Sequence, residues 1–467
     1  MGGYCSAQFR LLCASVAGLA LVLSGCGGGS HTTSSSSSQA TQQKSGQLPA
    51  TADPSGQFQT FSTTGTVNFN NEFFQSLGSN GRKCVSCHQP GEGWSVTPPG
   101  IQARFNNTSG TDPIFTPNDG STCPTDDVST VAARQTAYSL LLNKGLIRIA
   151  RPIPGGAEFT LTGASDPYNC STSTAIAMFR RPLPATDLKF ENTIMWDSRE
   201  DLFAQTIFND LKSQAKNATL GHAQSAAAPT DAQLTSIVNF ELALFNAQTV
   251  DNAAGSLTDQ GGRGGPQNLS QEPFTPGANS VFAVGSFFNP DVFNLYIAWE
   301  SLSGTDSVTQ ARLSIARGEK LFNSKLVNID SVRGFNDVLN QVIFAGTCSS
   351  CHSTFNVGNS STNQSMNIGT ADATRRTPDL PLYTFTCANN QGIFQVDDPG
   401  LALTTGKCAD IAKFKVPVLR DLAPRAPYFH DGQAATLMDV VDFYNNRFQI
   451  GLTTQEKTDL VNFLNSL

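Results

Sequence analysis

The feature that most constrains this chain is the pattern Cys-x-x-Cys-His, which occurs at residues 84–88 and again at residues 348–352. Two thiols at this spacing can add to the two vinyl groups of a haem, while the adjacent imidazole ligates the iron from one side. A redox or zinc-binding Cys-x-x-Cys with a chance histidine is the alternative. Two copies with matching flanks favour two covalently attached haems, with His88 and His352 as proximal iron ligands.

A helical pattern precedes each motif and another follows it, so the chain contains a weak internal repeat. The leading helices carry apolar residues on one face, at Phe69, Phe73 and Leu77 in the first copy and at Ile315, Gly318 and Phe322 in the second. The closing helices begin with the capping-box sequences Thr230-x-x-Gln233 and Thr453-x-x-Glu456. This order is typical of small cytochrome c domains. We therefore expect a mainly α fold of two cytochrome c-like haem domains packed face to face, with long loop insertions.

Stretches rich in Gly, Pro, Asn and Thr separate the helical segments and set the expected boundaries. We expect a signal peptide at 1–26, a flexible Gly/Ser/Thr-rich linker at 27–58, a first haem domain with an insertion at 59–250, an inter-domain insertion at 251–307 and a second haem domain at 308–467.

The N-terminal segment predicts export and a lipid anchor. Arg10 precedes an apolar run, 11–23, that is too short to span a bilayer permanently. The run leads into Ser-Gly-Cys26, which resembles the lipobox of bacterial lipoproteins, in which the cysteine is acylated. We expect the protein on the periplasmic side of the bacterial cell envelope, anchored through Cys26 at the outer membrane. An ordinary signal peptide with a chance cysteine is the alternative.

The 11 cysteines divide completely among these roles. Two leave with the signal peptide, one takes the lipid, and four attach haem, namely Cys84, Cys87, Cys348 and Cys351. The even remainder predicts disulfides in an oxidising compartment. Proximity along the chain favours Cys123 with Cys170 and Cys387 with Cys408.

Charge and histidine content narrow the partners and the iron ligands. The net charge of −7 argues against nucleic acid as a partner. Of the five histidines, His31 lies in the linker, so histidine on both sides of both irons would require His222 and His430 together. At least one iron is therefore expected to have another sixth ligand, or none.

Several segments carry a resemblance to a known family. They are Phe-Lys-Val-Pro-Val-Leu-Arg at 414–420, Ala-Pro-Tyr-Phe-His-Asp-Gly at 426–432 and Met-Trp-Asp-Ser-Arg at 195–199. Together with the two haem motifs, these segments resemble the bacterial di-haem cytochrome c peroxidase and MauG family. The resemblance implies reduction of hydrogen peroxide at the first haem, with electrons passed from the second.

Two alternative functions stay open. One is MauG-like or oxygenase-type oxidation of a protein or organic substrate, and the other is a non-enzymatic di-haem electron-transfer cytochrome. The expected partners are hydrogen peroxide and a small electron-donor protein, either a cytochrome c or a cupredoxin, or an oxidisable substrate. Contact with the membrane is expected only through the lipid anchor.

The resemblance also implies roles around the second haem. The distal ligand of the family falls at Tyr444, fourteen residues after His430. Tyrosine there resembles the MauG type, whereas ordinary peroxidases have methionine. A phenolate stabilises ferric and higher-valent iron, and a thioether favours ferrous iron. Met438 or no ligand is the alternative. His430 corresponds to a histidine beside the haem edge.

The carbonyls of Arg425 and Pro427 match positions that bind a calcium ion in the family. Carbonyl ligation does not depend on the side chain, so calcium is a further expected ion.

Around the first haem, the resemblance implies an open iron, because no histidine lies between the first motif and Trp196. Trp196 would relay electrons between the haems, and a buried core tryptophan is the alternative. Gln214 lies in a segment that resembles the family's glutamine segment, and Gln224 stands where the family has a catalytic glutamate. Because an amide cannot shuttle a proton as a carboxylate does, His222 is expected as the acid–base group, with an iron ligand or a structural histidine as alternatives.

Overall fold

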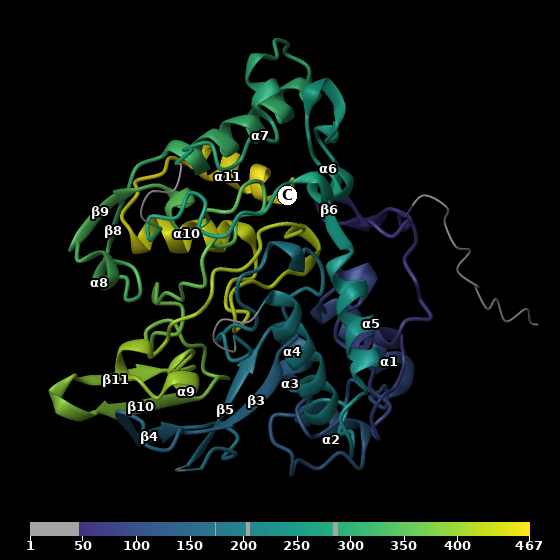
Figure 1. Ribbon diagram of the computed structural model, residues 1–467, viewed down its shortest axis with the longest axis vertical. Helices are drawn as coiled ribbons and strands as arrows, with labels where there is room; N and C mark the ends of the chain where they lie inside the picture. The colour runs from purple at the N-terminus through teal and green to yellow at the C-terminus, as the bar shows by residue number, and fades with distance from the viewer. Residues whose placement is uncertain (1–45, 173, 202–205, 284–287) are drawn as a thin grey trace, which may run out of the picture. The chain divides into compact units, whose positions relative to one another are not determined.

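The computed structural model describes residues 46–172, 174–201, 206–283 and 288–467 (Figure 1). The expected signal peptide, the lipidation site Cys26 and most of the expected linker lie outside the described residues. The described residues belong to one compact unit, Gln42–Leu467. None of the helices in these ranges combines the length and the apolar character that crossing a bilayer requires.

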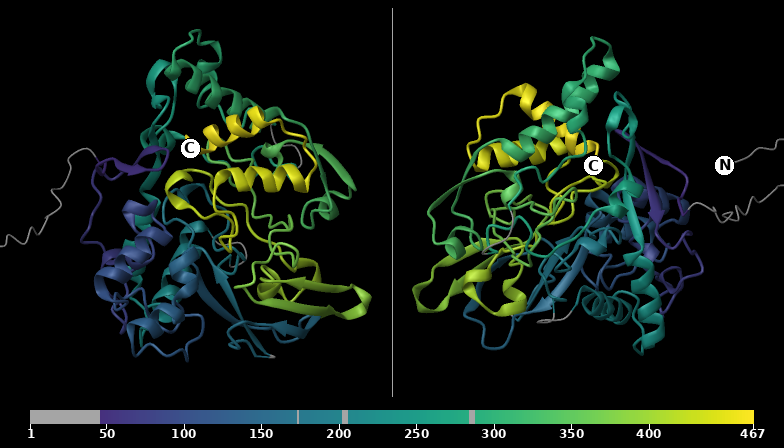
Figure 2. Two further views of the ribbon diagram at one scale, coloured as in Figure 1. Left: turned by 180° about the vertical axis from the view of Figure 1, so that it is seen from behind. Right: turned by 45° about the horizontal axis from the view of Figure 1, so that its top comes forward.

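Three helices surround the second Cys-x-x-Cys-His motif. Helix α7 (Ser307–Ser324) leads to the motif, and α10 (Leu437–Arg447) and α11 (Thr454–Asn465) follow it at the end of the chain (Figure 2). The capping box predicted at Thr453 is present. Helices α7 and α11 cross at Gly318, where an added Cβ would lie 2.0 Å from the carbonyl oxygen of Asp459. The predicted apolar face of α7 is therefore confirmed, and glycine is needed there for the close approach.

In the first copy of the repeat, the predicted closing helix forms but the predicted leading helix does not. Helices α4 (Ile207–Gly221) and α5 (Asp231–Leu242) form, and the capping box at Thr230 is confirmed. The predicted leading helix is wrong, because only a short 3₁₀ helix, Glu72–Phe74, is present. The side chain of Asn71 accepts a hydrogen bond from the backbone N–H of Phe73, and such local bonds compete with α-helix formation.

The expectation of a mainly α fold is wrong. The structure contains 33% helix and 17% strand, and its described ranges form four sheets, all antiparallel. Strands occur in the expected linker, in both expected haem domains and in the inter-domain insertion, so they are not confined to segments expected as loops. Strand β10 (Leu382–Cys387) alternates buried and half-buried residues and places Tyr383 and Phe385 inside, which is the period of a strand. Short strands of this kind are hard to recognise among turn-rich sequence.

One sheet joins the N-terminal part to the middle of the chain. It has the order β1 (Thr51–Asp53), β2 (Gly56–Ser62), β6 (Leu244–Asp251) and β7 (Gly255–Ser256). Strand β1 and the start of β2 fall within 27–58, the range expected to be a flexible linker.

A second sheet ties the two halves of the chain together. Strand β10 pairs with β4 (Phe159–Ser165) on one side and with β11 (Ile393–Val396) on the other. The disulfides Cys123–Cys170 and Cys387–Cys408 are both present, so both predicted pairings are confirmed. Segments from the two halves therefore form a joint layer below α7, α10 and α11 in Figure 1, and each disulfide lies within one half.

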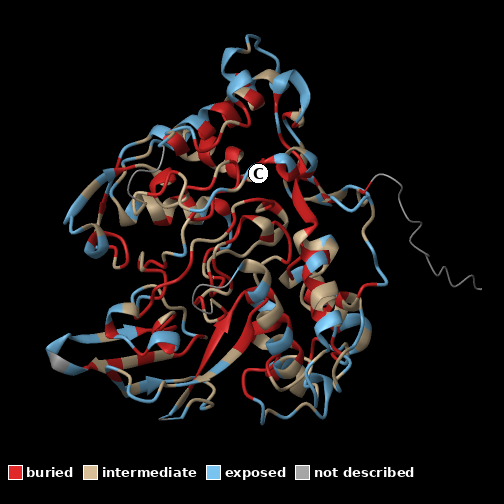
Figure 3. Ribbon diagram, in the orientation of Figure 1, coloured by how far each residue is buried: buried red, intermediate tan, exposed pale blue. Residues whose placement is uncertain are grey.

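The other elements are short. The remaining sheets pair β3 (Ile147–Pro152) with β5 (Ala175–Arg180), and β8 (Val327–Asp330) with β9 (Ile343–Gly346). The remaining helices are α1 (Pro98–Thr108), α2 (Val131–Ala137), α3 (Ser139–Lys144), α6 (Pro266–Gln271), α8 (Asn336–Leu339) and α9 (Ala402–Thr405). Figure 3 shows β5 as buried over most of its length, and it leads directly into the segment between the two candidate sites.

Candidate haem-binding site

The two Cys-x-x-Cys-His motifs have the same local structure. Each begins with a 3₁₀ helix, Cys84–Ser86 in the first and Cys348–Ser350 in the second. In each, the serine hydroxyl accepts a hydrogen bond of 3.0 Å from the backbone N–H three residues earlier. All four cysteines of the motifs are free thiols. The repeat inferred from sequence is therefore a structural repeat at the motifs themselves.

The histidine of each motif is oriented by a backbone carbonyl. His88 Nδ1 lies 3.1 Å from the carbonyl oxygen of Trp94, and His352 Nδ1 is bonded in the same way to Gly358. A proton on Nδ1 leaves the lone pair of Nε2 available for a metal. Burial lowers the pKa of both histidines to about 4. Both imidazoles are therefore neutral at pH 7, which is the form that ligates iron.

Each motif opens onto its own cavity. The first cavity, of about 190 Å³, is lined by Cys84, Cys87 and His88, and the second, of about 240 Å³, by Cys348, Cys351 and His352. Two free thiols and a neutral imidazole at the wall of an apolar cavity are the donor set of a c-type haem. The residues present fit a haem at each motif.

The two cavities share a wall. Its members line both cavities, and they are Arg181, Pro182, Leu183, Trp196, Lys415 and Val418. The indole Nε1 of Trp196 donates a hydrogen bond of 2.8 Å to the carbonyl of Arg181, and its ring meets the His430 ring edge-on at 6.3 Å. Trp196 thus lies in the wall between the two cavities.

The neighbouring Asp197 anchors this wall. Its buried carboxylate pairs with Arg180 at 2.7 Å, with Arg199 at 2.8 Å and with Arg151 at 3.2 Å. Burial alone would raise the pKa of Asp197, but the three guanidinium groups hold it well below its usual value. This ion-pair network fixes the segment that carries Trp196.

Tyr444 and His430 both line the second cavity. Burial raises the pKa of the Tyr444 phenol above its usual value, so a phenolate there requires a bound cation. Met438, the alternative ligand, is not among the residues that line this cavity. Tyr444 on α10 lines the same cavity as His352, and this position is compatible with iron ligation.

His222 lines the first cavity and is held by a residue that the sequence did not single out. Its Nδ1 is hydrogen-bonded to one carboxylate oxygen of Asp119, and Arg82 binds the other oxygen. Although burial alone would raise the pKa of Asp119, the bond to His222 and the charge of Arg82 lower it. An ionised carboxylate therefore fixes the imidazole, leaving its second nitrogen for proton transfer. Asp119 lies in the long insertion, 103 residues from His222. The sequence spacing therefore could not predict that the two side chains meet.

The two predicted glutamines are separated by the structure. Gln214 on α4 lines the first cavity. Gln224 is exposed, does not line this cavity, and accepts a hydrogen bond of 3.3 Å from Asn80. The sequence therefore misplaced Gln224, because the chain turns away after α4, where Gln224 adopts a positive φ of 53°.

Glu241 is a second residue that sequence analysis missed as part of the site. It lies on the buried face of α5 and lines the first cavity. Burial raises its pKa to about 8, and its Oε2 has no hydrogen-bond partner among the described residues. Glu241 thus brings a neutral carboxylic acid to the first cavity at pH 7.

The backbone carbonyls expected to bind calcium lie beside a buried cation, the guanidinium of Arg181. The carbonyl of Arg425 accepts a hydrogen bond of 3.0 Å from Arg181 Nη2. The same buried guanidinium donates a hydrogen bond of 3.0 Å to the backbone carbonyl of Lys144. Pro427 lines the second cavity. A calcium ion beside this guanidinium would be repelled. These residues do not fit calcium.

Two motif-bearing cavities on either side of Trp196 define a candidate two-centre redox protein of the cytochrome c type. No protein family model matches the chain. Cytochrome-c peroxidase IdrP1 of Denitromonas iodatirespirans is 40% identical over 81 residues, which are 15% of this chain and 22% of that protein. Cytochrome-c peroxidase IdrP2 of the same organism is 46% identical over 66 residues, 13% of this chain and 18% of that protein.

These matches confirm that the chain resembles the di-haem cytochrome c peroxidase family, over part of its length. The chain spans about a fifth of the length of the curated relatives that it matches. A solved MauG-like protein associated with microbial copper homeostasis matches 85% of this chain and 86% of its own, with a TM-score of 0.37 and 16% identity.

Proposed function

We propose that this chain is a di-haem c-type peroxidase that reduces hydrogen peroxide, with electrons passed from the second cavity to the first. The observation that carries the proposal is the shared wall, in which Trp196 contacts both cavities. The likeness to cytochrome-c peroxidases over 81 and 66 residues supports the same chemistry. Cys84, Cys87, Cys348 and Cys351 would attach two haems covalently, with His88 and His352 as proximal ligands.

When bound, haem supplies an iron that exchanges electrons with peroxide. Reduction of one hydrogen peroxide to two waters also consumes two protons and two electrons. His222 would deliver protons in the first cavity, because Asp119 holds its Nδ1 and the other ring nitrogen can take up a proton and pass it on. Gln214 would orient the peroxide by hydrogen bonding from the same cavity wall.

The expected electron donor is a small cytochrome c or cupredoxin that docks near the second cavity. The two disulfides support an oxidising compartment. We therefore propose the periplasmic side of the cell envelope, with a lipid anchor at Cys26, which lies outside the described residues.

A second candidate function rests on Tyr444. A phenolate bound to the second iron would stabilise the oxidised states of that iron and make it a poorer electron donor. The same two cavities would then oxidise a protein or organic substrate in the MauG manner. Tyr444→Met distinguishes the two functions, because it should raise peroxidase turnover with a reduced cytochrome c if Tyr444 ligates the iron, and should leave it unchanged otherwise.

The test of the peroxidase proposal uses two matched glutamines. Steady-state peroxide reduction with a reduced cytochrome c should fall by about 10-fold or more in Gln214→Ala, because an oriented hydrogen bond at the reacting group is lost. Gln224→Ala should retain wild-type turnover, since that side chain is exposed outside the cavity. Equal effects of the two substitutions, or no peroxide reduction by the wild-type holoprotein, would contradict the proposal.

A further inference from the structure

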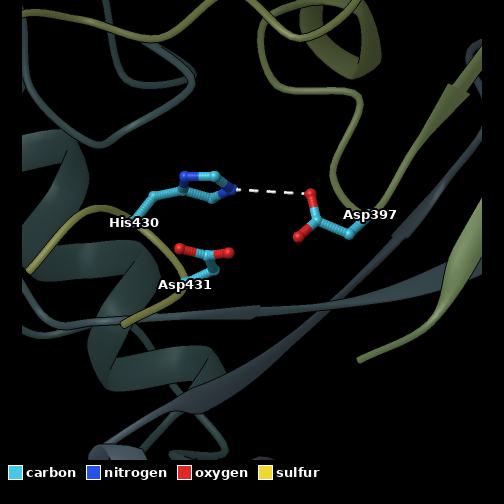
Figure 4. Close-up of side chains that lie close together, drawn as sticks. All are labelled: Asp397, His430 and Asp431. Carbon is cyan, nitrogen blue, oxygen red and sulfur yellow. Dashed lines mark ion pairs between the residues drawn. The ribbon is translucent and has the colours of Figure 1, made fainter. Parts of the chain in front are cut away.

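A cluster of three buried side chains lies behind the second cavity. Asp397 follows strand β11, and His430 and Asp431 lie in the loop before α10 (Figure 4). Their exposed fractions are 4%, 1% and 1%. One ligand atom from each lies within 4.8 Å of the others, and His430 Nε2 is 3.8 Å from Asp397 Oδ1. Three metal-ligating groups thus converge from two separate segments.

The groups that face one another in this cluster lack hydrogen bonds. Among the described residues, neither carboxylate oxygen of Asp397 has a hydrogen-bond partner, and neither does His430 Nε2. Asp431 is held in place by Gln433, whose side-chain amide donates at 2.7 Å. Leaving buried polar atoms without hydrogen-bond partners is energetically costly. Lone pairs without partners on Asp397 and His430, within one small cluster, indicate a ligand that accepts lone pairs.

The charges around the cluster point to a cation. Asp398, the nearest further carboxylate, is already satisfied by Arg180 and by the backbone N–H of Gly400. Arg180 is shared between Asp398 and Asp197, so it does not neutralise Asp397. Arg375 already acts on Asp431, so a divalent cation would supply the positive charge that Asp397 lacks.

We propose that Asp397, Asp431 and His430 Nε2 bind a divalent transition metal of the zinc class. One imidazole and two carboxylates are a nitrogen–oxygen donor set of the kind zinc accepts, with bonds of about 2.0–2.2 Å. Two ligands of one such ion lie at most about 4.2 Å apart, so the observed separations close with small side-chain rotations.

This site is separate from the haem irons. Neither Asp397 nor Asp431 lines either cavity. His430 does line the second cavity, so it lies between that cavity and the two carboxylates. The His430 ring also stacks on Phe414 at 4.2 Å and meets Trp196 at 6.3 Å. The metal would fix the imidazole at the cavity wall, so its role is positional. The proposal does not depend on which reaction the haems perform.

The test measures metal content and thermal stability of the full-length holoprotein, purified without a polyhistidine tag. After removal of loose metal and addition of Zn²⁺, mass spectrometry should find one zinc per chain besides the haem iron. Zn²⁺ should raise the melting temperature of the chelator-treated wild type, which requires no variant to fold. Mg²⁺ at the same concentration should not.

Substitution gives the matched control. Asp397→Asn combined with Asp431→Asn should lose the zinc and the thermal response. Asp410→Asn should keep both, since Asp410 lies on the same stretch of chain and contacts Lys413 instead. Wild-type protein that binds no stoichiometric zinc and shows no thermal response would overturn the proposal, and a proton shared by Asp397 and Asp431 would then explain the cluster. Zinc retained by the double variant would overturn it equally.

Discussion

At the scale of single residues, the least expected feature is the carboxylate behind His222. Asp119 and Arg82 hold this imidazole in one orientation at the first cavity. Arg82 lies just before the first haem motif, whereas Asp119 lies in the insertion, far from both motifs in sequence. The pair has the form of a base and its orienting carboxylate, which commonly carries proton transfer in enzymes.

Asp119→Asn tests this pair. Loss of the carboxylate removes the group that fixes the tautomer of His222, and the turnover of peroxide should fall by about 100-fold, the usual scale of an acid–base contribution. Steady-state kinetics and haem spectra check the effect and the intactness of the site. Asp112→Asn is the control, because Asp112 pairs with Arg104 in the same insertion and does not line the cavity. Unchanged turnover in Asp119→Asn would assign His222 a structural role.

Asp197 gives a prediction on stability. Asp197→Asn leaves the buried guanidinium of Arg180 and the half-buried ones of Arg151 and Arg199 without their shared partner, and the free energy of unfolding at pH 7 should fall by about 3–5 kcal/mol. Because the folded pKa of Asp197 is depressed, its contribution is present above the unfolded pKa of about 4 and is lost as the pH falls further. Denaturant unfolding across this range should show a smaller acid loss in the variant. An equal acid loss would contradict the account.

At the scale of elements, the crossing of α7 and α11 depends on one glycine. Gly318→Ala would place a methyl group against the carbonyl of Asp459, and it should lower the free energy of unfolding by about 1–3 kcal/mol or more. Gly221→Ala on α4 is the control, since an added Cβ there meets nothing within 4 Å. Thermal or denaturant unfolding measures both. Similar effects in the two variants would show that the helices do not pack as described.

Helices whose ends are marked by capping residues were predictable from sequence. Thr230 and Thr453 begin α5 and α11 as expected, because capping boxes are local signals. The strands were not predictable, since β4 and β10 are brief and gain their stability by pairing with each other across 200 residues of chain. The motif residues of the site were found, whereas Asp119 and Glu241 were missed because only tertiary packing brings them to the cavity.

At the scale of the whole molecule, the two cavities are joined by their shared wall. Trp196→Phe should slow electron passage between the cavities and lower turnover by about 10-fold or more, since it removes the oxidisable indole. Trp299→Phe is the control, because Trp299 also donates its Nε1 to a carbonyl, that of Asp259, but lines neither cavity. Rapid-mixing absorbance should separate the two variants. Equal rates would exclude a relay through Trp196.

The central claim is that two haem centres deliver two electrons to one peroxide. The most direct measurement mixes the fully reduced holoprotein, without oxygen, with one equivalent of hydrogen peroxide while both haem absorbances are recorded. The account predicts that a single equivalent oxidises both centres and that two waters form. Two centres that stay reduced, or a requirement for two equivalents of peroxide per chain, would contradict it.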